Sequence, residues 1–183
     1  LVVVSGPAGV GKDTVVAKLL EKDNSFSLSV SATTRAPRGE EKHGVNYYYF
    51  STDDFLSKID NDDFIEYAKY GSNYYGTLKK EASDNKVVIL EPQGLNNFLK
   101  VLDNVFAVYL QTEEAVLKER MISRGDSMLE VMKRLENDRI LFSEEQLAKI
   151  DYTINTTHLS VSEIASKIYN KYKEYSQGMI SLF

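Results

Sequence analysis

The residues best suited to chemistry form a glycine-rich segment near the start of the sequence, which reads Gly6-Pro7-Ala8-Gly9-Val10-Gly11-Lys12. It fits the first seven positions of the phosphate-binding pattern G-x-x-x-x-G-K-[ST]. Glycines let successive backbone N–H groups point at an anion, and a helix that follows directs its positive end at the same place. A lysine in the seventh position brings a mobile positive charge to the β- and γ-phosphate oxygens of a nucleotide. The segment therefore predicts a nucleoside triphosphate site.

The eighth position departs from this pattern. Asp13 stands where a serine or threonine hydroxyl would bind Mg²⁺, and Thr14 follows directly. In one interpretation Asp13 holds Mg²⁺, directly or through water, because Mg²⁺ prefers carboxylate ligands. In the other, Asp13 points away and favours the helix N-terminus by its charge, while Thr14 contacts the phosphates. We favour the second interpretation and keep Asp13 as the candidate metal ligand.

A phosphate loop needs a strand before it and a helix after it, and the sequence predicts both. Leu1–Val4 is apolar without alternation, which is typical of a strand buried on both faces. After the glycines, apolar residues recur at helical spacing at Val15, Val16, Leu19 and Leu20. This setting favours a phosphate loop over the alternative, a glycine-rich turn with an exposed lysine.

Further strands and helices alternate along most of the chain. Strands are expected at Lys86–Leu90, Val105–Leu110 and Tyr152–Ile154. Helices are expected at about Gln93–Leu102, Glu113–Ser123, Met128–Lys149 and Ser160–Tyr172. This alternation predicts a three-layer α/β fold with a parallel central sheet.

The segment from Thr33 to Asp84 has a different composition. It is rich in tyrosine and glycine and contains short extended runs at Tyr47–Phe50, Phe64–Tyr70 and Asn73–Tyr75, with one helical stretch near Asp53–Ile59. We interpret residues 33–84 as a small, mixed, mostly β insertion in a single domain whose core comprises residues 1–32 and 85–183.

Composition excludes several classes of site. The 183 residues contain no cysteine and two histidines, so disulfides, thiolate nucleophiles and zinc–cysteine sites are excluded and a histidine-built metal centre is not expected. A net charge of −5 argues against bulk attraction to nucleic acid or to a membrane surface. The apolar start is too short for a signal peptide or a membrane span, and a cytoplasmic location is expected.

Four further motifs follow in a fixed order: Ser31-Ala32-Thr33-Thr34-Arg35-Ala36-Pro37-Arg38, Gly44-Val45-Asn46-Tyr47, Phe64-Ile65-Glu66-Tyr67 and Asn73-Tyr74-Tyr75-Gly76-Thr77. In these motifs the chain closely resembles the guanylate kinases, whose pattern reads S-x-T-T-R-x-P-R, G-x-x-Y, F-x-E and Y-Y-G-[ST]. With the phosphate loop, the resemblance covers essentially the whole chain. It implies a P-loop kinase that converts ATP and GMP to ADP and GDP with Mg²⁺, with dGMP as a further acceptor.

The resemblance also assigns a GMP site. The GMP phosphate would be gripped by two guanidinium groups and two phenols, those of Arg35, Arg38, Tyr47 and Tyr75. The base would be read by one carboxylate and two hydroxyls, those of Glu66, Ser31 and Thr77. Guanine presents N1–H and an amino group to the carboxylate and O6 to a hydroxyl, whereas adenine would leave buried groups unpaired at about 1–3 kcal/mol each.

Two features limit this assignment. Before Gln93, the family typically has two acidic residues; Glu91 takes one of their places, but Ile89 takes the other. Glu91 is kept as a GMP-binding candidate. Each residue also has a structural interpretation when the motifs are left aside. The two arginines of the phosphate grip would be a solvated pair in a loop, and the two tyrosines would be ordinary strand residues. Glu66 would be the exposed residue of a half-buried strand.

Three arginines resemble those of the family's lid, at about residues 121–134. The family has R-x-x-x-R-G, a short mobile stretch and then R-L, and here the stretch is one residue short. Arginines that close over a migrating phosphoryl group stabilise its charge, so the catalytic candidates are Lys12, Arg124 and Arg134. ATP binding is further assigned to Arg120, which could instead be a surface helix residue in a charge pair, and to Asn155 near the adenine.

The resemblance implies ATP and GMP as the partners, no nucleic acid, no membrane, and either a monomer or a homodimer. The implied phosphoryl transfer needs no strong general base, because the acceptor phosphate is already an anionic nucleophile. Two alternatives remain open at this point. One is a guanylate-kinase-like module that binds phosphorylated peptides without activity, and the other is a kinase for another nucleoside monophosphate.

Overall fold

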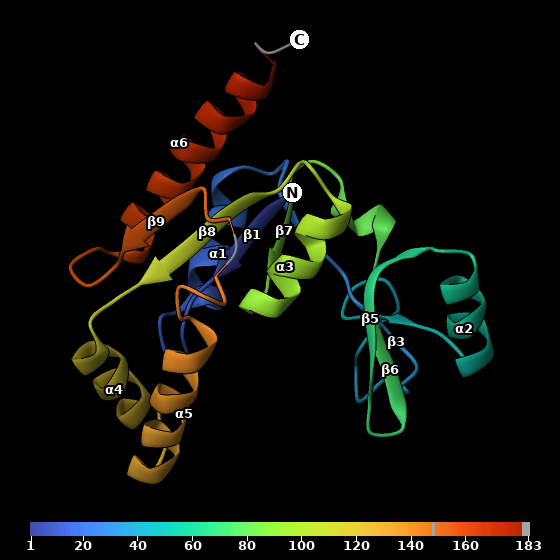
Figure 1. Cartoon of the computed structure of the whole chain (residues 1–183), viewed down its shortest axis with the longest axis horizontal. Helices are drawn as coiled ribbons and strands as arrows, with labels where there is room; N and C mark the ends of the chain where they lie inside the picture. The colour runs from blue at the N-terminus through green and yellow to red at the C-terminus, as the bar shows by residue number, and fades with distance from the viewer. Residues whose placement is uncertain (148, 181–183) are drawn as a thin grey trace.

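A computed structural model describes residues 1–147 and 149–180 (Figure 1). The central sheet is five-stranded and parallel throughout, in the order β2-β7-β1-β8-β9. Its strands are β1 (Val2–Ser5), β2 (Ser27–Leu28), β7 (Lys86–Ile89), β8 (Phe106–Gln111) and β9 (Tyr152–Asn155). The predicted α/β class with a parallel central sheet is confirmed.

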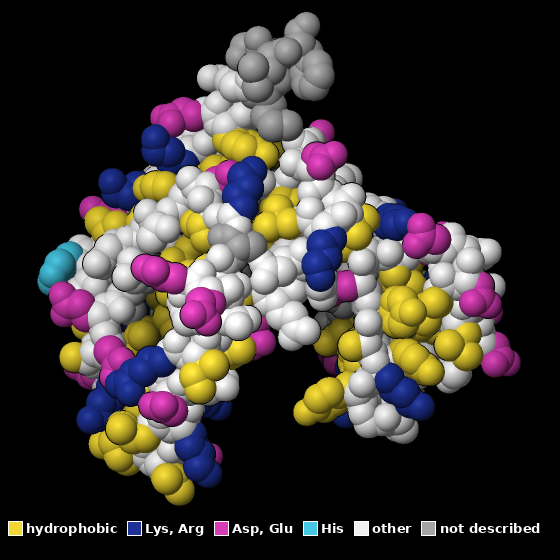
Figure 2. Space-filling model, viewed as in Figure 1, with side chains coloured by type: hydrophobic (Ala, Val, Ile, Leu, Met, Phe, Trp, Pro, Cys, Tyr) yellow, Lys and Arg dark blue, Asp and Glu magenta, His cyan; other side chains and the backbone are white. Residues whose placement is uncertain are grey.

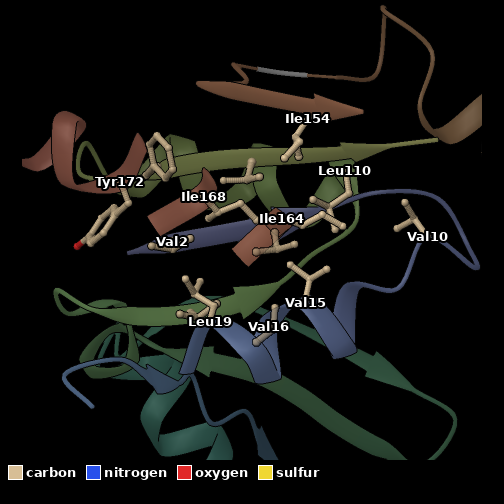
Figure 3. Close-up of a cluster of buried hydrophobic side chains, with 14 of the residues drawn as sticks. Val2, Val10, Val15, Val16, Leu19, Leu110, Ile154, Ile164, Ile168 and Tyr172 are labelled. Atoms are coloured by element: carbon tan, nitrogen blue, oxygen red, sulfur yellow. The ribbon is translucent and has the colours of Figure 1, made fainter. Parts of the chain in front are cut away.

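The apolar run of β1 is buried on both faces, and its alternate residues enter two different cores. Val2 and Val4 pack in a cluster with α1 (Lys12–Lys22) and α6 (Val161–Ile180), as Figure 3 shows for several of these side chains. Val3 packs on the opposite face in a second cluster with α3 (Pro92–Val101). The sheet is therefore a middle layer between helices, as a continuous apolar strand requires.

Residues between β2 and β7 build a second, mixed sheet in the order β4-β3-β6-β5. Its strands are β3 (Ala32–Thr33), β4 (Tyr48–Tyr49), β5 (Phe64–Tyr70) and β6 (Asn73–Leu78), and α2 (Thr52–Asp60) packs on it. Phe55 of α2 is fully buried, and its ring lies 4.5 Å from that of Phe64 and 5.5 Å from that of Tyr74. A separate core, built on aromatic rings, therefore holds this sheet together.

One glycine of the second sheet is required by close packing. The register of β5 against β6 shifts between Phe64 and Glu66. Gly76 pairs with Tyr67, next to this irregularity, and a Cβ atom on Gly76 would lie 2.7 Å from the Glu66 carbonyl oxygen. Glycine at position 76 therefore lets β6 approach the backbone of β5 at Glu66.

A buried carboxylate lies where the chain passes between the two sheets. Glu81, in the 3₁₀ turn η1 (Lys79–Ala82), is only 3% exposed. Its Oε2 accepts the Val30 N–H at 2.9 Å and pairs with Lys86 at 3.2 Å, while its Oε1 accepts the Tyr48 hydroxyl at 2.7 Å. One side chain thus joins the residues that lead into and out of the second sheet.

The two remaining helices, α4 (Glu114–Ser123) and α5 (Met128–Leu141), pack together at the other end of the molecule. They stand opposite the second sheet, and the space-filling view shows an open notch between these two arms (Figure 2). Across the described residues, no helix combines the length and apolar character needed to cross a membrane.

Two predicted helix ends are wrong. Helix α5 ends at Leu141 rather than Lys149, because turns at Ser143, closed by hydrogen bonds from Gln146 and Leu147, replace the helix. Helix α6 runs past Tyr172 to Ile180. The ring of Tyr175 packs 5.1 Å from that of Phe106, and its hydroxyl donates to the Val105 carbonyl, so contacts with the sheet continue for another turn.

We predict that Phe55→Ala lowers the free energy of unfolding by about 3–5 kcal/mol, because it leaves a cavity between two stacked rings. Urea titration would measure the loss. Leu56→Ala is the matched control: Leu56 is 38% exposed, and its truncation should change stability by no more than about 0.5 kcal/mol. Equal losses for the two variants would contradict this account of the second core.

Candidate active site

The glycine segment forms the turn between β1 and α1. Gly9 and Gly11 have φ angles of 81° and 91°, which L side chains rarely adopt, and Gly11 is the N-cap of α1. The Lys12 ammonium donates to the Gly6 carbonyl at 2.6 Å and the Pro7 carbonyl at 3.3 Å. Burial lowers the pKa of Lys12, and nearby carboxylates, Asp138 most strongly, oppose that shift. The loop thus has the backbone geometry expected of an anion cradle.

A cavity of about 320 Å³ opens over this loop, and all three predicted arginines line it. They lie beside six residues of the loop and the first turn of α1: Ala8, Gly9, Gly11, Lys12, Asp13 and Thr14. Arg120 on α4 donates to the Val10 carbonyl at 3.4 Å. Arg124 is the C-cap of α4, and Arg134 lies on α5. Four cations from three elements therefore face one cavity.

Asp126, in the turn between α4 and α5, holds two of these arginines. Its Oδ2 accepts from Arg124 Nε at 2.9 Å and Nη2 at 2.7 Å, and the Arg134 guanidinium lies 3.4 Å away. Hydrogen bonds from Arg124 lower the pKa of Asp126, so it stays ionised. The sequence placed Asp126 in the predicted lid but gave no signal that it would pair with both arginines.

Asp138 on α5 makes a second contact that the sequence did not reveal. Its Oδ2 accepts the N–H of Ala8, in the phosphate loop, at 2.8 Å. This hydrogen bond joins residues 130 positions apart and brings a negative charge to one of the backbone donors of the anion cradle. A bound polyphosphate would therefore meet repulsion from this carboxylate.

A second cavity of about 270 Å³ contains most of the predicted acceptor residues. Those that line it are Ser31, Tyr47, Glu66, Tyr75 and Thr77. Its remaining wall includes Ile89 and Leu90 at the carboxyl end of β7. Since β7 pairs in parallel with β1, Val4 with Ile89, this cavity and the phosphate loop lie at the carboxyl ends of neighbouring strands. This is the usual position for ligands in open α/β sheets.

Glu66 contributes a carboxylate to the wall of the second cavity. Burial raises the pKa of Glu66, and a hydrogen bond from Asn97 opposes this shift. That bond runs from Asn97 Nδ2 to Glu66 Oε2 at 3.2 Å, so helix α3, which covers one face of the central sheet, orients a carboxylate of the second sheet. Asn97 was not predicted, because the two residues are distant in sequence and no motif contains both.

Arg35 and Arg38 meet at the carboxylate of Glu41. The Arg35 guanidinium pairs with Glu41 at 3.0 Å and lies 5.4 Å from the centre of the Tyr47 ring. The backbone N–H of Arg38 donates to Glu41 at 2.8 Å, while its exposed side chain does not line the cavity. Hydrogen bonds, first from the Arg38 N–H and then from the Tyr49 hydroxyl, lower the pKa of Glu41.

Outside the phosphate loop, four predicted residues line neither cavity: Arg35, Arg38, Glu91 and Asn155. Glu91 is the exposed N-cap residue of α3, and its charge acts on Lys12. Asn155, at the end of β9, lines a different cavity of about 450 Å³, and its side-chain oxygen accepts the Thr157 N–H at 3.0 Å. The structure does not bring Asn155 into the phosphate-loop cavity.

The oxygen atoms at the phosphate loop fit a hard cation. Asp13 and Thr14 adjoin each other on the cavity wall. Within residues 1–147 and 149–180, no group of three or more acidic, histidine or cysteine side chains could hold a metal. Mg²⁺ commonly binds through one or two protein carboxylates together with substrate phosphates, which matches this donor set.

Comparison with known proteins gives one consistent family. The family model described as guanylate kinase matches residues 1–173. The chain is 46% identical over 132 residues to guanylate kinase of Clostridium acetobutylicum, covering 68% of this chain and 63% of that protein, which is less than two thirds of its length. It is 36% identical to the Halalkalibacterium halodurans guanylate kinase and 34% identical to that of Clostridioides difficile. These matches cover 88% and 95% of this chain and 82% and 96% of those proteins.

A solved structure agrees with these matches. The crystal structure of guanylate kinase from Anaplasma phagocytophilum superposes with a TM-score of 0.64 at 27% identity. The superposition covers 96% of this chain and 85% of that one. The likeness thus extends over both sheets.

We predict that Asp138→Asn binds a non-hydrolysable nucleoside triphosphate more tightly, by roughly tenfold, because it removes one negative charge beside the cradle and keeps an acceptor for Ala8. Isothermal titration calorimetry would measure the affinity. Asp60→Asn, at an exposed position in α2, is the control for net charge. An unchanged or weaker affinity in the Asp138 variant would refute the repulsion.

Proposed function

This chain belongs to the guanylate kinase family, and from that premise we propose that it transfers the terminal phosphoryl group of ATP to GMP, giving ADP and GDP. One observation carries the proposal. A cationic cavity over a phosphate loop and a second cavity walled by a carboxylate and hydroxyls open at the carboxyl ends of the adjacent strands β1 and β7. Phosphoryl transfer between two nucleotides needs donor and acceptor sites in this adjacency.

The donor phosphates bind in the loop. Backbone N–H groups of residues 6–14, other than Pro7, and the Lys12 ammonium hold the β- and γ-phosphate oxygens. Arg124 and Arg134 stabilise the charge that spreads over the migrating group, and Asp126 keeps both guanidinium groups directed at the cavity until then. Arg120 fixes α4 against the loop. Residues 121–134 act as the lid, whose closure excludes water.

The acceptor binds on the second sheet, which serves as the GMP-binding insertion. Its phosphate is held by Arg35, Arg38, Tyr47 and Tyr75. Glu66 accepts hydrogen bonds from guanine N1–H and the 2-amino group, while the hydroxyls of Ser31 and Thr77 serve O6. Asn97 holds one oxygen of Glu66 and so sets the plane of the carboxylate. Nothing in this set of contacts requires a ribose 2′-hydroxyl, so dGMP is a further acceptor.

Catalysis depends on alignment and charge neutralisation rather than on a general base. The GMP phosphate already carries the nucleophilic oxygen, so the protein needs to hold that oxygen in line with the γ-phosphate and to neutralise charge. Bound Mg²⁺ would neutralise charge on the donor phosphates. Because Asp13 lines the phosphate-loop cavity together with Thr14, we adopt here the interpretation in which Asp13 would hold Mg²⁺, directly or through water, with Thr14 beside it at the first turn of α1. Lys12 and the lid arginines neutralise the remaining charge.

We expect ADP release from ATP in the presence of GMP or dGMP and at least about 100-fold lower kcat/KM with AMP, because adenine leaves two or more buried groups unpaired. A coupled assay with GMP, dGMP, AMP, UMP and TMP at several Mg²⁺ concentrations would measure this. The proposal fails if saturating GMP produces no ADP at any Mg²⁺ concentration. It also fails if AMP is used as well as GMP.

We predict that Glu66→Gln lowers kcat/KM for GMP by roughly 100-fold, because the amide cannot accept from both guanine donors. Affinity for ATP should not change. Glu40→Gln, an exposed neighbour in sequence of the phosphate-gripping arginines, should behave as the unsubstituted protein. Steady-state kinetics with varied GMP would compare the three proteins.

The pH dependence gives an independent check of Glu66. Because burial raises its pKa, Glu66 takes up a proton at a higher pH than an exposed glutamate does, and the protonated form loses acceptor capacity. The value of kcat/KM for GMP should therefore fall as the pH drops through this raised pKa. In Glu66→Gln that acid limb should be absent; an identical limb in both proteins would assign the titration to another group.

A further inference from the structure

A separate cavity of about 380 Å³ lies on the face of the second sheet that looks away from the acceptor site. Successive side chains of a strand point to opposite faces. Accordingly, Tyr47 and Thr77 line the acceptor cavity, whereas their neighbours Tyr48 and Leu78 line this one. The two cavities share no lining residue, and no step of the proposed phosphoryl transfer uses this cavity.

Three aromatic rings form one wall of this cavity. The His43 ring meets Tyr48 edge-on at 5.5 Å and Phe50 edge-on at 5.9 Å, and the rings of Tyr48 and Phe50 are nearly parallel, 6.4 Å apart. The His43 Nδ1 accepts the Tyr49 N–H at 3.1 Å. The wall is therefore fixed by packing and by a backbone hydrogen bond.

Three lysines and two aspartates surround these rings. Lys79 pairs with Asp62 at 2.7 Å, and Lys58 lies 3.8 Å from Asp63. The third lysine, Lys80, makes no ion pair among the residues that the structure describes. Its ammonium instead lies 3.9 Å from the centre of the Tyr48 ring. The cavity thus has one positive charge more than its carboxylates neutralise, and that charge is held over an aromatic face.

We propose that this cavity binds a small molecule that combines one aromatic ring with one anionic group, that is, an aryl phosphate or an aryl carboxylate. The ring of the ligand packs on Tyr48 and Phe50, and its anion accepts hydrogen bonds from Lys80, whose ammonium moves from the ring face to the charge. The volume of about 380 Å³ lies within the range of about 300–1,000 Å³ found for small-molecule sites. A bare anion would not pack on the aromatic wall, and a neutral ring would not pair with the Lys80 ammonium.

The test is a titration with phenyl phosphate, followed by ligand-observed NMR, in the presence of saturating ADP and GMP that occupy the other two sites. Benzoate is the carboxylate arm; inorganic phosphate and benzyl alcohol represent the charge alone and the ring alone. We expect phenyl phosphate or benzoate to bind, and each partial ligand to bind at least tenfold more weakly than the better of the two. Whichever of the two binds more tightly identifies the class of anion.

Lys80→Ala should weaken that binding at least fivefold. Lys42→Ala is the matched control, since Lys42 is exposed in the same part of the chain but lies outside the cavity, and it should leave binding unchanged. Phe50→Leu, which removes the ring and keeps an apolar side chain, should weaken binding of phenyl phosphate but not of inorganic phosphate. Equal affinity in Lys80→Ala, or loss of binding when ADP and GMP are present, would overturn the proposal.

The same titrations without nucleotides keep this result separate from the proposed kinase function. If GMP itself did not bind, the difference between Lys80→Ala and Lys42→Ala would still report on this cavity. Conversely, a protein that phosphorylates GMP but shows no such difference would retain its function and lose this site.

Discussion

The parallel pairing of β1 with β7 is the constraint on which the candidate site depends. It sets Val4 beside Ile89 and continues in the hydrogen bond from Leu90 N–H to the Val4 carbonyl at 3.2 Å. The phosphate loop follows one of these strands, and the other forms a wall of the acceptor cavity. Shifting the register would displace the two cavities relative to each other, and the in-line transfer that we propose tolerates little displacement. The apolar residues that both strands bury specify this register, because a slip by one residue would move each side chain to the opposite face of the sheet.

Carboxylates hold three of the arginines that belong to the candidate site. Asp126 holds two arginines of the phosphate-loop cavity, and Glu41 holds Arg35 beside the rings of the acceptor site. Asp138 instead takes up a backbone donor of the loop. The net charge of −5 is therefore compatible with the two anionic substrates that we propose, because several arginines are gathered and oriented by nearby acids.

Local patterns predicted the parts of the molecule that local physics determines. Strand β5 has the predicted bounds, Phe64–Tyr70, and the loop between β1 and α1 follows from its glycines and its flanking apolar residues. The pairs Asn97–Glu66 and Asp138–Ala8 could not be predicted, because each joins residues that only the tertiary fold brings together. Strands β2 and β3 have two residues each, too few to show a period. The end of α5 was missed because the helical pattern continued into turns.

The carboxylate of Glu81 determines how the second sheet can turn relative to the rest of the protein. The chain leaves the central sheet near Val30 and re-enters it at Lys86, and both points bind the same Glu81 oxygen. Because both crossings of the chain lie at this carboxylate, rotation about an axis close to it strains the Glu81 bonds least, whereas the contact of β5 with α3 through Asn97 and Glu66 would have to shift. Swinging of the second sheet towards α4 and α5 would therefore leave the Glu81 bonds nearly unstrained and move the tip of the β5–β6 hairpin furthest.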